Sequence, residues 1–352
     1  MAHIGILVSA HGFGHLAREL AVAEALLARG CAVEVWTAAP PAVVHDYLPG
    51  VSLRSIRLDV GLVQRDSLHE DLIETAEALK RAMSDDHIDG IAALLREAAF
   101  DAVIVDIAPM ALEAARRAQT PALAVGNFDW AWTYSQYPGL AEFAEQCAHW
   151  QAAHDALRME PGPPLHHFAG VEDVGVVGRW RPAQRPSGVE DDEQLVLVSF
   201  GGLGLDGLDE LLPRVAGVRW LLAPPMDPLH RSDCLFVEGV SYPSLVGGAD
   251  RVLTKPGYGI FTECALAGTP VLLVRRPGFP ESAFLEPAFS KRGDVVLKGN
   301  TQAELRAELA SVLQLPAPRH EPFERHGAGR VAERVLELVR RSGASKAGDE
   351  RD

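Results

Sequence analysis

Cysteine is scarce in this sequence, and its placement argues against two kinds of covalent or metal stabilisation. The four cysteines (Cys31, Cys147, Cys234 and Cys264) lie far apart, with no Cys-x-x-Cys pair and no histidine at ligand spacing. Neither a disulfide framework nor a structural zinc site is therefore expected. Reduced thiols are typical of the cytoplasm, which is the location that the sequence predicts.

Long apolar runs are also missing. No stretch approaches the about 18–20 consecutive apolar residues that a transmembrane helix needs. Residues 1–9 lack a basic leader and a small-residue cleavage site, and we interpret them as a buried strand rather than a signal peptide. The sequence therefore predicts no transmembrane segment.

Positive charge is in short supply as well. Against 33 Lys and Arg residues stand 48 Asp and Glu residues, which gives a net charge of −15 at pH 7. Nucleic acids and anionic membranes attract proteins with a positive field, so neither is expected as the main partner. The arginines of residues 325–341 could form a local basic patch, although a solvated helix face is the plainer interpretation.

What the sequence does contain is a repeated alternation of strand and helix signals. The 352 residues are too many for one compact core. A polar linker over 179–192 separates two blocks, and each block predicts a parallel sheet with helices on both faces. We predict an N-terminal Rossmann-like domain over 1–180, a C-terminal one over 193–322, and a last helix over 323–341 that could pack across either.

Apolar runs predict the strands of both domains. In the first domain they fall at 3–9, 32–37, 51–58, 102–105, 122–125 and 174–177, with one long helix over 139–158. In the second domain they fall at 195–199, 219–222, 235–237, 251–253, 271–274 and 295–297. Each domain opens with a strand that runs into a glycine turn. Two such domains facing each other would form a cleft, which is a usual place for ligands.

One glycine turn of the second domain is a candidate phosphate-binding site. Gly257, Tyr258 and Gly259 lie between a predicted strand and a predicted helix, so amides and the positive end of the helix dipole could face a diphosphate. Glu263 follows in the same helix and could accept hydrogen bonds from both hydroxyls of a ribose. The alternative is a tight strand–helix turn with a glutamate that stabilises the helix dipole.

A second glycine turn strengthens this interpretation. Gly201 and Gly202 follow the first strand of the same domain, and their amides could close on the phosphates from the other side. Alone, such a turn is a weak signal, because most glycine turns are only sharp bends. Two of them after strands of one domain favour a nucleotide diphosphate pocket.

In the first domain, Gly12 and Gly14 formally fit the Gly-x-Gly-x-x-(Gly/Ala) dinucleotide fingerprint. Glu34 lies about twenty residues further on, as the fingerprint requires of its ribose ligand. It sits inside the second predicted strand, however, rather than at its end. An NAD(P)-dependent oxidoreductase is therefore a lesser alternative.

His15 follows this loop at the predicted start of a helix. The helix dipole there would favour a neutral imidazole, as a general base requires. Asp106 ends a neighbouring predicted strand at the same sheet edge, and could orient His15 and stabilise its protonated form. The alternative is that both residues cap helices.

These residues resemble a known enzyme superfamily. Residues 9–16, Ser-Ala-His-Gly-Phe-Gly-His-Leu, resemble the first loop of the GT-B UDP-glycosyltransferases. Residues 101–106 are similar to the strand that ends, in the plant enzymes, with the aspartate of a His–Asp dyad. Residues 250–284 are similar to their donor site, with Glu263 matching the ribose-binding glutamate. The resemblance implies a GT-B fold, a UDP-sugar donor and a catalytic pair formed by His15 and Asp106.

A second resemblance is closer in its motifs. Residues 11–15, 127–130, 255–259 and 274–276 all look like segments of the glycosyltransferase-like N-terminal domain of L-arabinokinases. In that family the domain precedes a kinase module and need not transfer sugar. The 352 residues leave no room for a kinase module, so we expect the GT-B unit to carry the activity itself.

Further details refine the expected chemistry. Many retaining GT-B enzymes carry a second glutamate eight positions before the ribose ligand, where this sequence has Lys255, and that difference favours inversion. No convincing Asp-x-Asp motif occurs, so a catalytic metal is not expected. Arg276 would add positive charge beside the leaving group. Glu281 stands where a glutamine-type sugar ligand is usual, which leaves the donor sugar open.

The sequence as a whole predicts an inverting, metal-independent glycosyltransferase that needs no cofactor. It would move a sugar from a nucleotide donor, with UDP as the expected nucleotide, to a hydroxyl acceptor. A sugar-nucleotide epimerase or hydrolase of the same fold, or a non-catalytic nucleotide-sugar sensor, stays an alternative. Four aromatic residues could form an acceptor-binding wall or pack around a helix start: Trp130, Trp132, Tyr134 and Tyr137.

Overall fold

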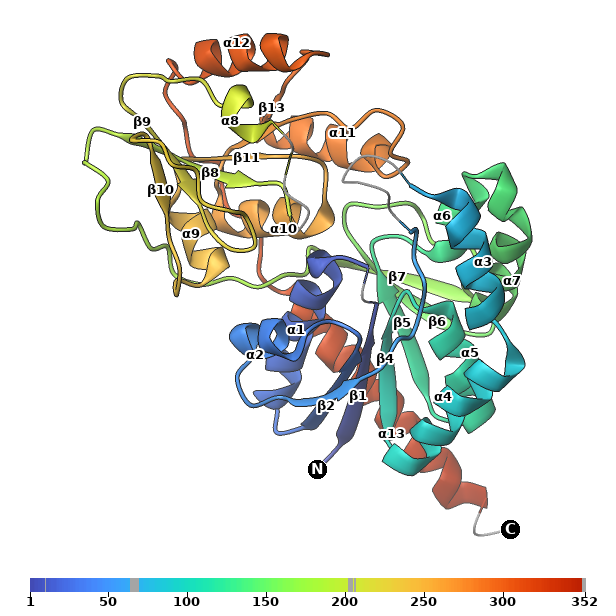
Figure 1. Cartoon of the computed structure of the whole chain (residues 1–352). Coiled ribbons are helices and arrows are strands. Elements are labelled where there is room, and N and C mark those ends of the chain that lie inside the picture. Colours follow the sequence, from blue (N-terminus) through green and yellow to red (C-terminus); the bar gives the residue numbers. More distant parts are fainter. Residues whose placement is uncertain (10, 64–69, 202–204, 206, 350–352) are drawn as a thin grey trace. The chain divides into compact units, whose positions relative to one another are not determined.

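The structure is a computed structural model that describes residues 1–9, 11–63, 70–201, 205 and 207–349 (Figure 1). It divides into two compact units. Unit 1 holds the described residues up to Gly178 and those from His326 onward. Unit 2 holds the described residues within Arg179–Arg325.

Unit 1 is a parallel sheet covered by helices on both faces. Within the described residues its strand order is β3-β2-β1-β4-β5-β6-β7. The strands are β1 (His3–Val8), β2 (Ala32–Thr37), β3 (Ser52–Ser55), β4 (Ala102–Asp106), β5 (Ala122–Gly126), β6 (Asp155–Met159) and β7 (Gly170–Gly175). The helices are α1 (Phe13–Leu27), α2 (Pro41–Tyr47), α3 (Leu72–Ala82), α4 (Asp85–Ala98), α5 (Pro109–Ala118), α6 (Trp130–Ser135), the 3-10 turn η1 (Pro138–Leu140), α7 (Ala141–Gln151) and α13 (Gly327–Asp349).

Two helix layers bury the two faces of this sheet. On one face α1 and α13 pack against Ile4, Ile6 and Ile104. On the other, α4 and α5 pack against Leu7 and Val105. Neighbouring side chains of a strand point to opposite faces, so Ile6 and Leu7 serve different layers. The last helix, α13, contacts α1, β4 and β7 and thus belongs to unit 1 (Figure 1).

One predicted element of unit 1 is wrong. The expected single helix over 139–158 ends as α7 at Gln151, and the chain then forms β6. Ala156 and Leu157 are buried because β6 pairs with β5 and β7. The apolar residues of this segment also suit a helix, and the pairing of β6 with β5 and β7 decides in favour of a strand. The predicted strand at 174–177 begins earlier, as β7.

Unit 2 is a second parallel sheet, with strand order β10-β9-β8-β11-β12-β13 among the described residues. The strands are β8 (Gln194–Ser199), β9 (Val218–Leu222), β10 (Cys234–Phe236), β11 (Arg251–Thr254), β12 (Val271–Leu273) and β13 (Val295–Val296). The helices are α8 (Leu208–Leu211), α9 (Tyr242–Gly248), α10 (Tyr258–Ala267), α11 (Ser282–Arg292) and α12 (Gln302–Val312). The predicted fold class, two doubly wound α/β sheets, is confirmed.

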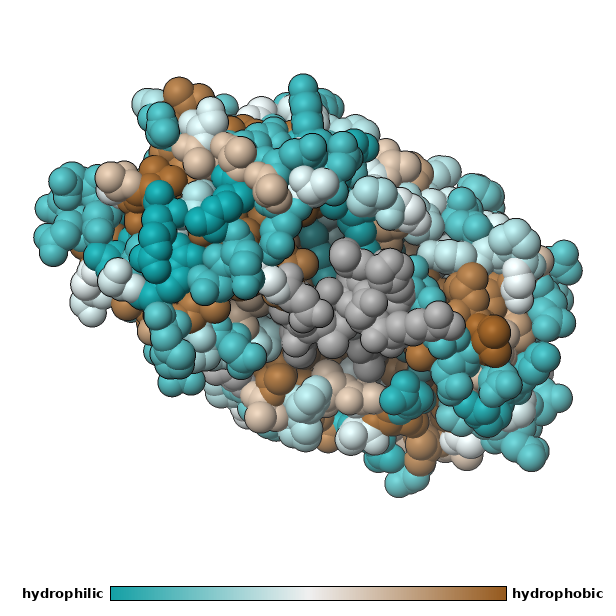
Figure 2. Space-filling model, turned by 45° about the horizontal axis from the view of Figure 1, so that its top comes forward, coloured by the Kyte–Doolittle hydropathy of each residue, from teal (hydrophilic) through white to brown (hydrophobic). Residues whose placement is uncertain are grey.

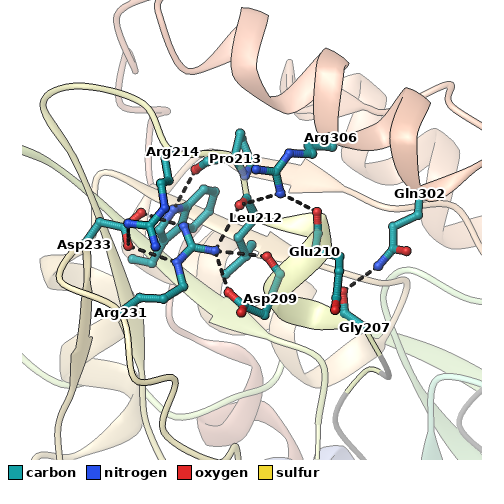
Figure 3. Close-up of polar contacts among 11 residues, drawn as sticks. Gly207, Asp209, Glu210, Leu212, Pro213, Arg214, Arg231, Asp233, Gln302 and Arg306 are labelled. Atoms are coloured by element: carbon teal, nitrogen blue, oxygen red, sulfur yellow. Dashed lines mark hydrogen bonds and ion pairs between the residues drawn. The ribbon is translucent and has the colours of Figure 1, made fainter.

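Arginine side chains anchor the short helix α8 that follows the first glycine turn of unit 2 (Figure 3). Arg231 donates to the carboxylates of Asp209 and Asp233 and to the backbone carbonyl of Leu212. Arg306, from α12, donates to the same Leu212 carbonyl at 3.1 Å. A four-residue helix gains little stability from its own backbone hydrogen bonds, so these contacts set its position.

The surface drawn in Figure 2 is largely hydrophilic, with separate apolar areas. Among the described residues, no helix combines the length and the apolarity that a bilayer crossing demands. The apolar residues gather instead around the two sheets.

Candidate functional site

Each sheet has one place where its strand order reverses direction. In unit 1 the chain goes from β1 outward to β2 and β3, and then returns to β4 on the other side of β1. In unit 2 the same reversal lies between β8 and β11. The crevice beyond the carboxyl ends of such a strand pair is the usual ligand site of doubly wound sheets. Among the described residues, the predicted site residues follow or end these four strands, except Arg276 and Glu281, which follow β12.

In unit 1 the reversal point holds an imidazole–carboxylate pair. Val8 and Asp106, the last residues of β1 and β4, are register partners. His15 is the third residue of α1, and its Nδ1 lies 2.8 Å from Asp106 Oδ2. Both side chains are buried, with His15 7% and Asp106 0% exposed. If Nδ1 donates to the carboxylate, Nε2 of the neutral ring is left as the proton acceptor.

Backbone geometry explains the glycine that precedes this pair. Gly12 has φ +95° and forms the N-cap of α1, where an added Cβ would meet no atom within 4 Å. The backbone angle, and not crowding, therefore favours glycine there. Gly14 is the second residue of α1. The turn brings His15 back over the end of β4, next to Asp106.

Three further ionisable residues lie near the pair. Arg18 Nη2 lies 3.0 Å from His15 Nδ1 and donates to Asp106 Oδ1 at 3.3 Å. Glu19 is fully buried, and neither of its carboxyl oxygens has a hydrogen-bond partner among the described residues. Burial, and then the charge of Asp106, raise the pKa of Glu19 well above its ordinary value. Burial likewise raises the pKa of Asp59, whose Oδ2 accepts from Trp130 Nε1.

Arg18, Glu19 and Asp59 were not among the residues predicted for the site. A signal for the first two was present, because positions 15, 18 and 19 share one face of a helix. Asp59 carried no such signal, since it lies in a loop and reaches the group only through tertiary folding.

The aromatic residues after β5 mainly form packing. Trp130 and Tyr134 are each 1% exposed, and their rings stack at 5.2 Å. Trp130 also meets Phe128 and His11 edge-on, at 5.4 and 5.2 Å. Phe128 lies in turn 5.6 Å from the His15 ring. Trp130 and Tyr134 therefore support the loop beside the imidazole. Of the four aromatic residues predicted to form an acceptor-binding wall, only Trp132 and Tyr137 are partly exposed.

In unit 2, Gly201 and the turn at Gly257 follow neighbouring strands. Ser199 and Thr254, the last residues of β8 and β11, are register partners, and Thr254 Oγ1 donates to the Ser199 carbonyl at 2.6 Å. Gly201 has φ +77°, a backbone conformation that favours glycine. Gly202 lies outside the described residues.

Helix α10 begins at the second turn. Gly257 is its N-cap, and Tyr258 and Gly259 are its first two residues, so their amides lie at the positive end of the helix dipole. Gly257 has an extended backbone (φ −169°) that any residue can adopt. Glu263 lies one turn beyond Gly259 on the same face of the helix. Burial raises the pKa of Glu263 to about 7, against a smaller opposing effect of Arg179.

Two cations accompany this turn. Lys255 follows β11 directly, and its pKa is lowered by burial and then by the charge of Arg276. The guanidinium of Arg276, 6% exposed, stacks 4.1 Å from the centre of the Phe279 ring. Glu281 is the buried N-cap of α11. The end of this sheet thus offers helix amides and positive charge, which suit a diphosphate, and a carboxyl group, which suits a diol.

No protein-family model matches the chain. L-arabinokinase of Arabidopsis thaliana is 29% identical over 305 residues, which are 79% of this chain and 28% of that protein. Among solved structures, the calicheamicin glycosyltransferase CalG4 has a TM-score of 0.60 at 18% identity, over 99% of this chain and 97% of its own. UGT89C1 of Arabidopsis thaliana, in complex with UDP, has a TM-score of 0.59 at 14% identity, over 96% of this chain and 95% of its own.

The chain has the GT-B fold. Both resemblances stated from the sequence, to GT-B glycosyltransferases and to L-arabinokinase, are confirmed. The chain spans a little over a quarter of the length of the curated relative that it matches. The roles of the individual site residues stay predictions that the geometry makes specific.

Proposed function

We propose that this GT-B protein is a glycosyltransferase that moves a sugar from a nucleotide donor to a hydroxyl group. One observation carries the proposal: the reversal point of each sheet holds one complementary half of the required chemistry. Unit 1 has a buried imidazole–carboxylate pair, 2.8 Å apart. Unit 2 has a helix N-terminus, two cations and the buried Glu263.

The donor half belongs to unit 2. Glu263 accepts hydrogen bonds from the ribose hydroxyls in its ionised form. Amides of Gly257, Tyr258 and Gly259 bind the diphosphate, since the dipole at a helix N-terminus favours anions, and the amide of Gly201 adds to them. Arg276 adds positive charge as negative charge develops on the departing diphosphate, a form of electrostatic stabilisation that requires no metal ion. UDP is the proposed nucleotide, and its presence in the UGT89C1 complex supports that choice.

The base belongs to unit 1. His15 Nε2 accepts the proton of the acceptor hydroxyl while the hydroxyl oxygen attacks the anomeric carbon. The bond from that carbon to the diphosphate oxygen breaks, and the electron pair leaves with the nucleotide diphosphate. The imidazolium then carries one proton on each nitrogen, and Asp106 accepts the hydrogen bond from the proton on Nδ1. A single displacement inverts the configuration at the anomeric carbon, and the lysine at position 255 in place of a carboxylate supports that course.

The test begins with the donor. Calorimetric titration with UDP-, GDP-, ADP- and dTDP-sugars should show a preference for one nucleotide, and NMR of the product anomer then reports inversion or retention. Turnover of the donor without an acceptor would favour an epimerase or hydrolase instead. Binding without turnover in a broad acceptor screen would favour a sensor. Binding of NAD and of no nucleotide sugar would contradict the proposal.

The cytoplasmic location stays a prediction of the sequence.

A further inference from the structure

Arg18 is the closest permanent cation to the imidazole–carboxylate pair within the described part of unit 1. It lies one turn after His15 on the same face of α1. Its Nη2 is 3.0 Å from His15 Nδ1 and 3.3 Å from Asp106 Oδ1. The Arg18 side chain is 2% exposed and that of Asp106 0%. Three groups therefore share one dry site, and the charge of each acts on the other two with little screening.

A carboxylate in a dry site favours protonation of a neighbouring imidazole and so removes the lone pair that a base needs. Asp106 alone would favour a second proton on the imidazole, because an ion pair costs less there than an isolated buried carboxylate. An imidazolium has no lone pair and cannot accept a proton from a substrate. A nearby guanidinium removes the difficulty, since it compensates the carboxylate and repels a second positive charge.

Two other acidic groups near His15 do not offset the charge of Arg18. Glu19 faces the pair from α1, and Asp59 faces it from the loop after β3. Burial raises the pKa of both carboxyl groups, which favours their neutral forms. With those two neutral, the charge balance of the site depends on Arg18 and Asp106.

We propose that Arg18 is a positioning residue that limits the His15–Asp106 pair to one proton at neutral pH. That proton lies on Nδ1, between the imidazole and the carboxylate, and Nε2 keeps its lone pair. The consequence for sugar transfer depends on the proposed function. The consequence for the protonation of the pair does not, because it follows from charges and distances within unit 1.

The experiment compares Arg18→Met with Arg29→Met. The control removes a surface arginine just beyond the end of α1, where it pairs with Glu333. The imidazole of His15 is followed by NMR as a function of pH, with its signals assigned by their loss in His15→Gln. In Arg18→Met the pH at which the pair takes up its second proton should rise by on the order of two units. Arg29→Met should titrate like the wild type, and an unchanged midpoint in Arg18→Met would overturn the inference.

Activity provides a readout that a purely structural role would not move. With the preferred nucleotide sugar, Arg18→Met should lose roughly 10- to 100-fold in rate at pH 7 and regain most of it at higher pH. Arg18→Lys, which keeps the cation, should stay closer to the wild-type profile. An equal loss at every pH would count against the inference. A shifted titration in a protein that turns over no nucleotide sugar would support the inference while the proposed function fails.

Arg18→Met leaves the buried Asp106 carboxylate without its cation and could fail to fold. A double variant therefore provides a second test. Arg18→Met combined with Asp106→Asn removes both buried charges, and its reference is Asp106→Asn alone. His15 should take up a proton at a higher pH in the double variant, because the reference still holds the guanidinium beside Nδ1. Equal midpoints in these two proteins would also overturn the inference.

Discussion

Glu263, the proposed ribose ligand, should destabilise the folded protein at neutral pH. Burial raises the pKa of its carboxyl from 4.5 to about 7. Between these two values the folded protein holds a proton that the unfolded chain has released, so stability falls as pH rises through that window. Each pH unit costs about 1.4 kcal/mol, and the whole shift about 3 kcal/mol. Above pH 7 the full cost is present; below pH 4.5 it is absent.

Glu263→Gln isolates this cost. Glutamine has nearly the same shape and carries no charge, so the variant should gain about 2–3 kcal/mol over the wild type between pH 5 and pH 8. Urea denaturation of both proteins at the two pH values gives this difference, and contributions from all other titrating groups cancel. Glu324→Gln, an exposed change in the same unit, is the matched control and should gain nothing.

The same substitution should weaken nucleotide binding. In the proposed function the ionised carboxylate accepts hydrogen bonds from two ribose hydroxyls, and hydrogen bonds to charged groups contribute about 1.5–3 kcal/mol. UDP affinity, measured by calorimetry, should therefore fall roughly 10- to 100-fold at pH 8 in Glu263→Gln. In the wild type, affinity should rise with pH up to about 7. Equal stability of the two proteins at both pH values would refute the reasoning, as would unchanged UDP affinity.

Three further predictions concern other parts of the chain. His15→Ala should bind UDP like the wild type but transfer sugar roughly 10²–10⁴ times more slowly, because it lacks the proton acceptor; normal turnover would remove His15 from the mechanism. Gly201→Ala places a Cβ in open space on a backbone with φ +77°, at a cost of about 1–2 kcal/mol. Calorimetry should show weaker UDP binding. Unaltered binding would mean that Gly201 does not contact the diphosphate. Arg231→Met removes the side chain that anchors α8 to Asp233. The unfolding free energy, measured by urea denaturation, should fall by about 1–3 kcal/mol. No loss would mean that apolar packing alone holds α8 in place.

Much of the fold could be predicted from local sequence. Buried parallel strands are short apolar runs, and the order in which they alternate with helices indicates a doubly wound sheet. The helix expected over 139–158 failed because β6 is decided by its pairing with β5 and β7. Local periodicity contains no information on partners that are distant in the sequence.

For the candidate site, the sequence by itself determined the residue types and their order: glycine turns after strands, His15 at a helix start, Asp106 at a strand end and Glu263 one turn into a helix. Gly12 and Gly201 have positive φ angles that favour glycine, and a helix start supplies amides for an anion, so these residue types could be recognised from the sequence. Only the tertiary structure decided that β1 and β4 are neighbours, that Arg18 and Asp59 join His15 and Asp106, and that Glu263 is buried enough to have a pKa of about 7. Those properties depend on distance and exclusion of water, which arise when segments remote in the chain pack together.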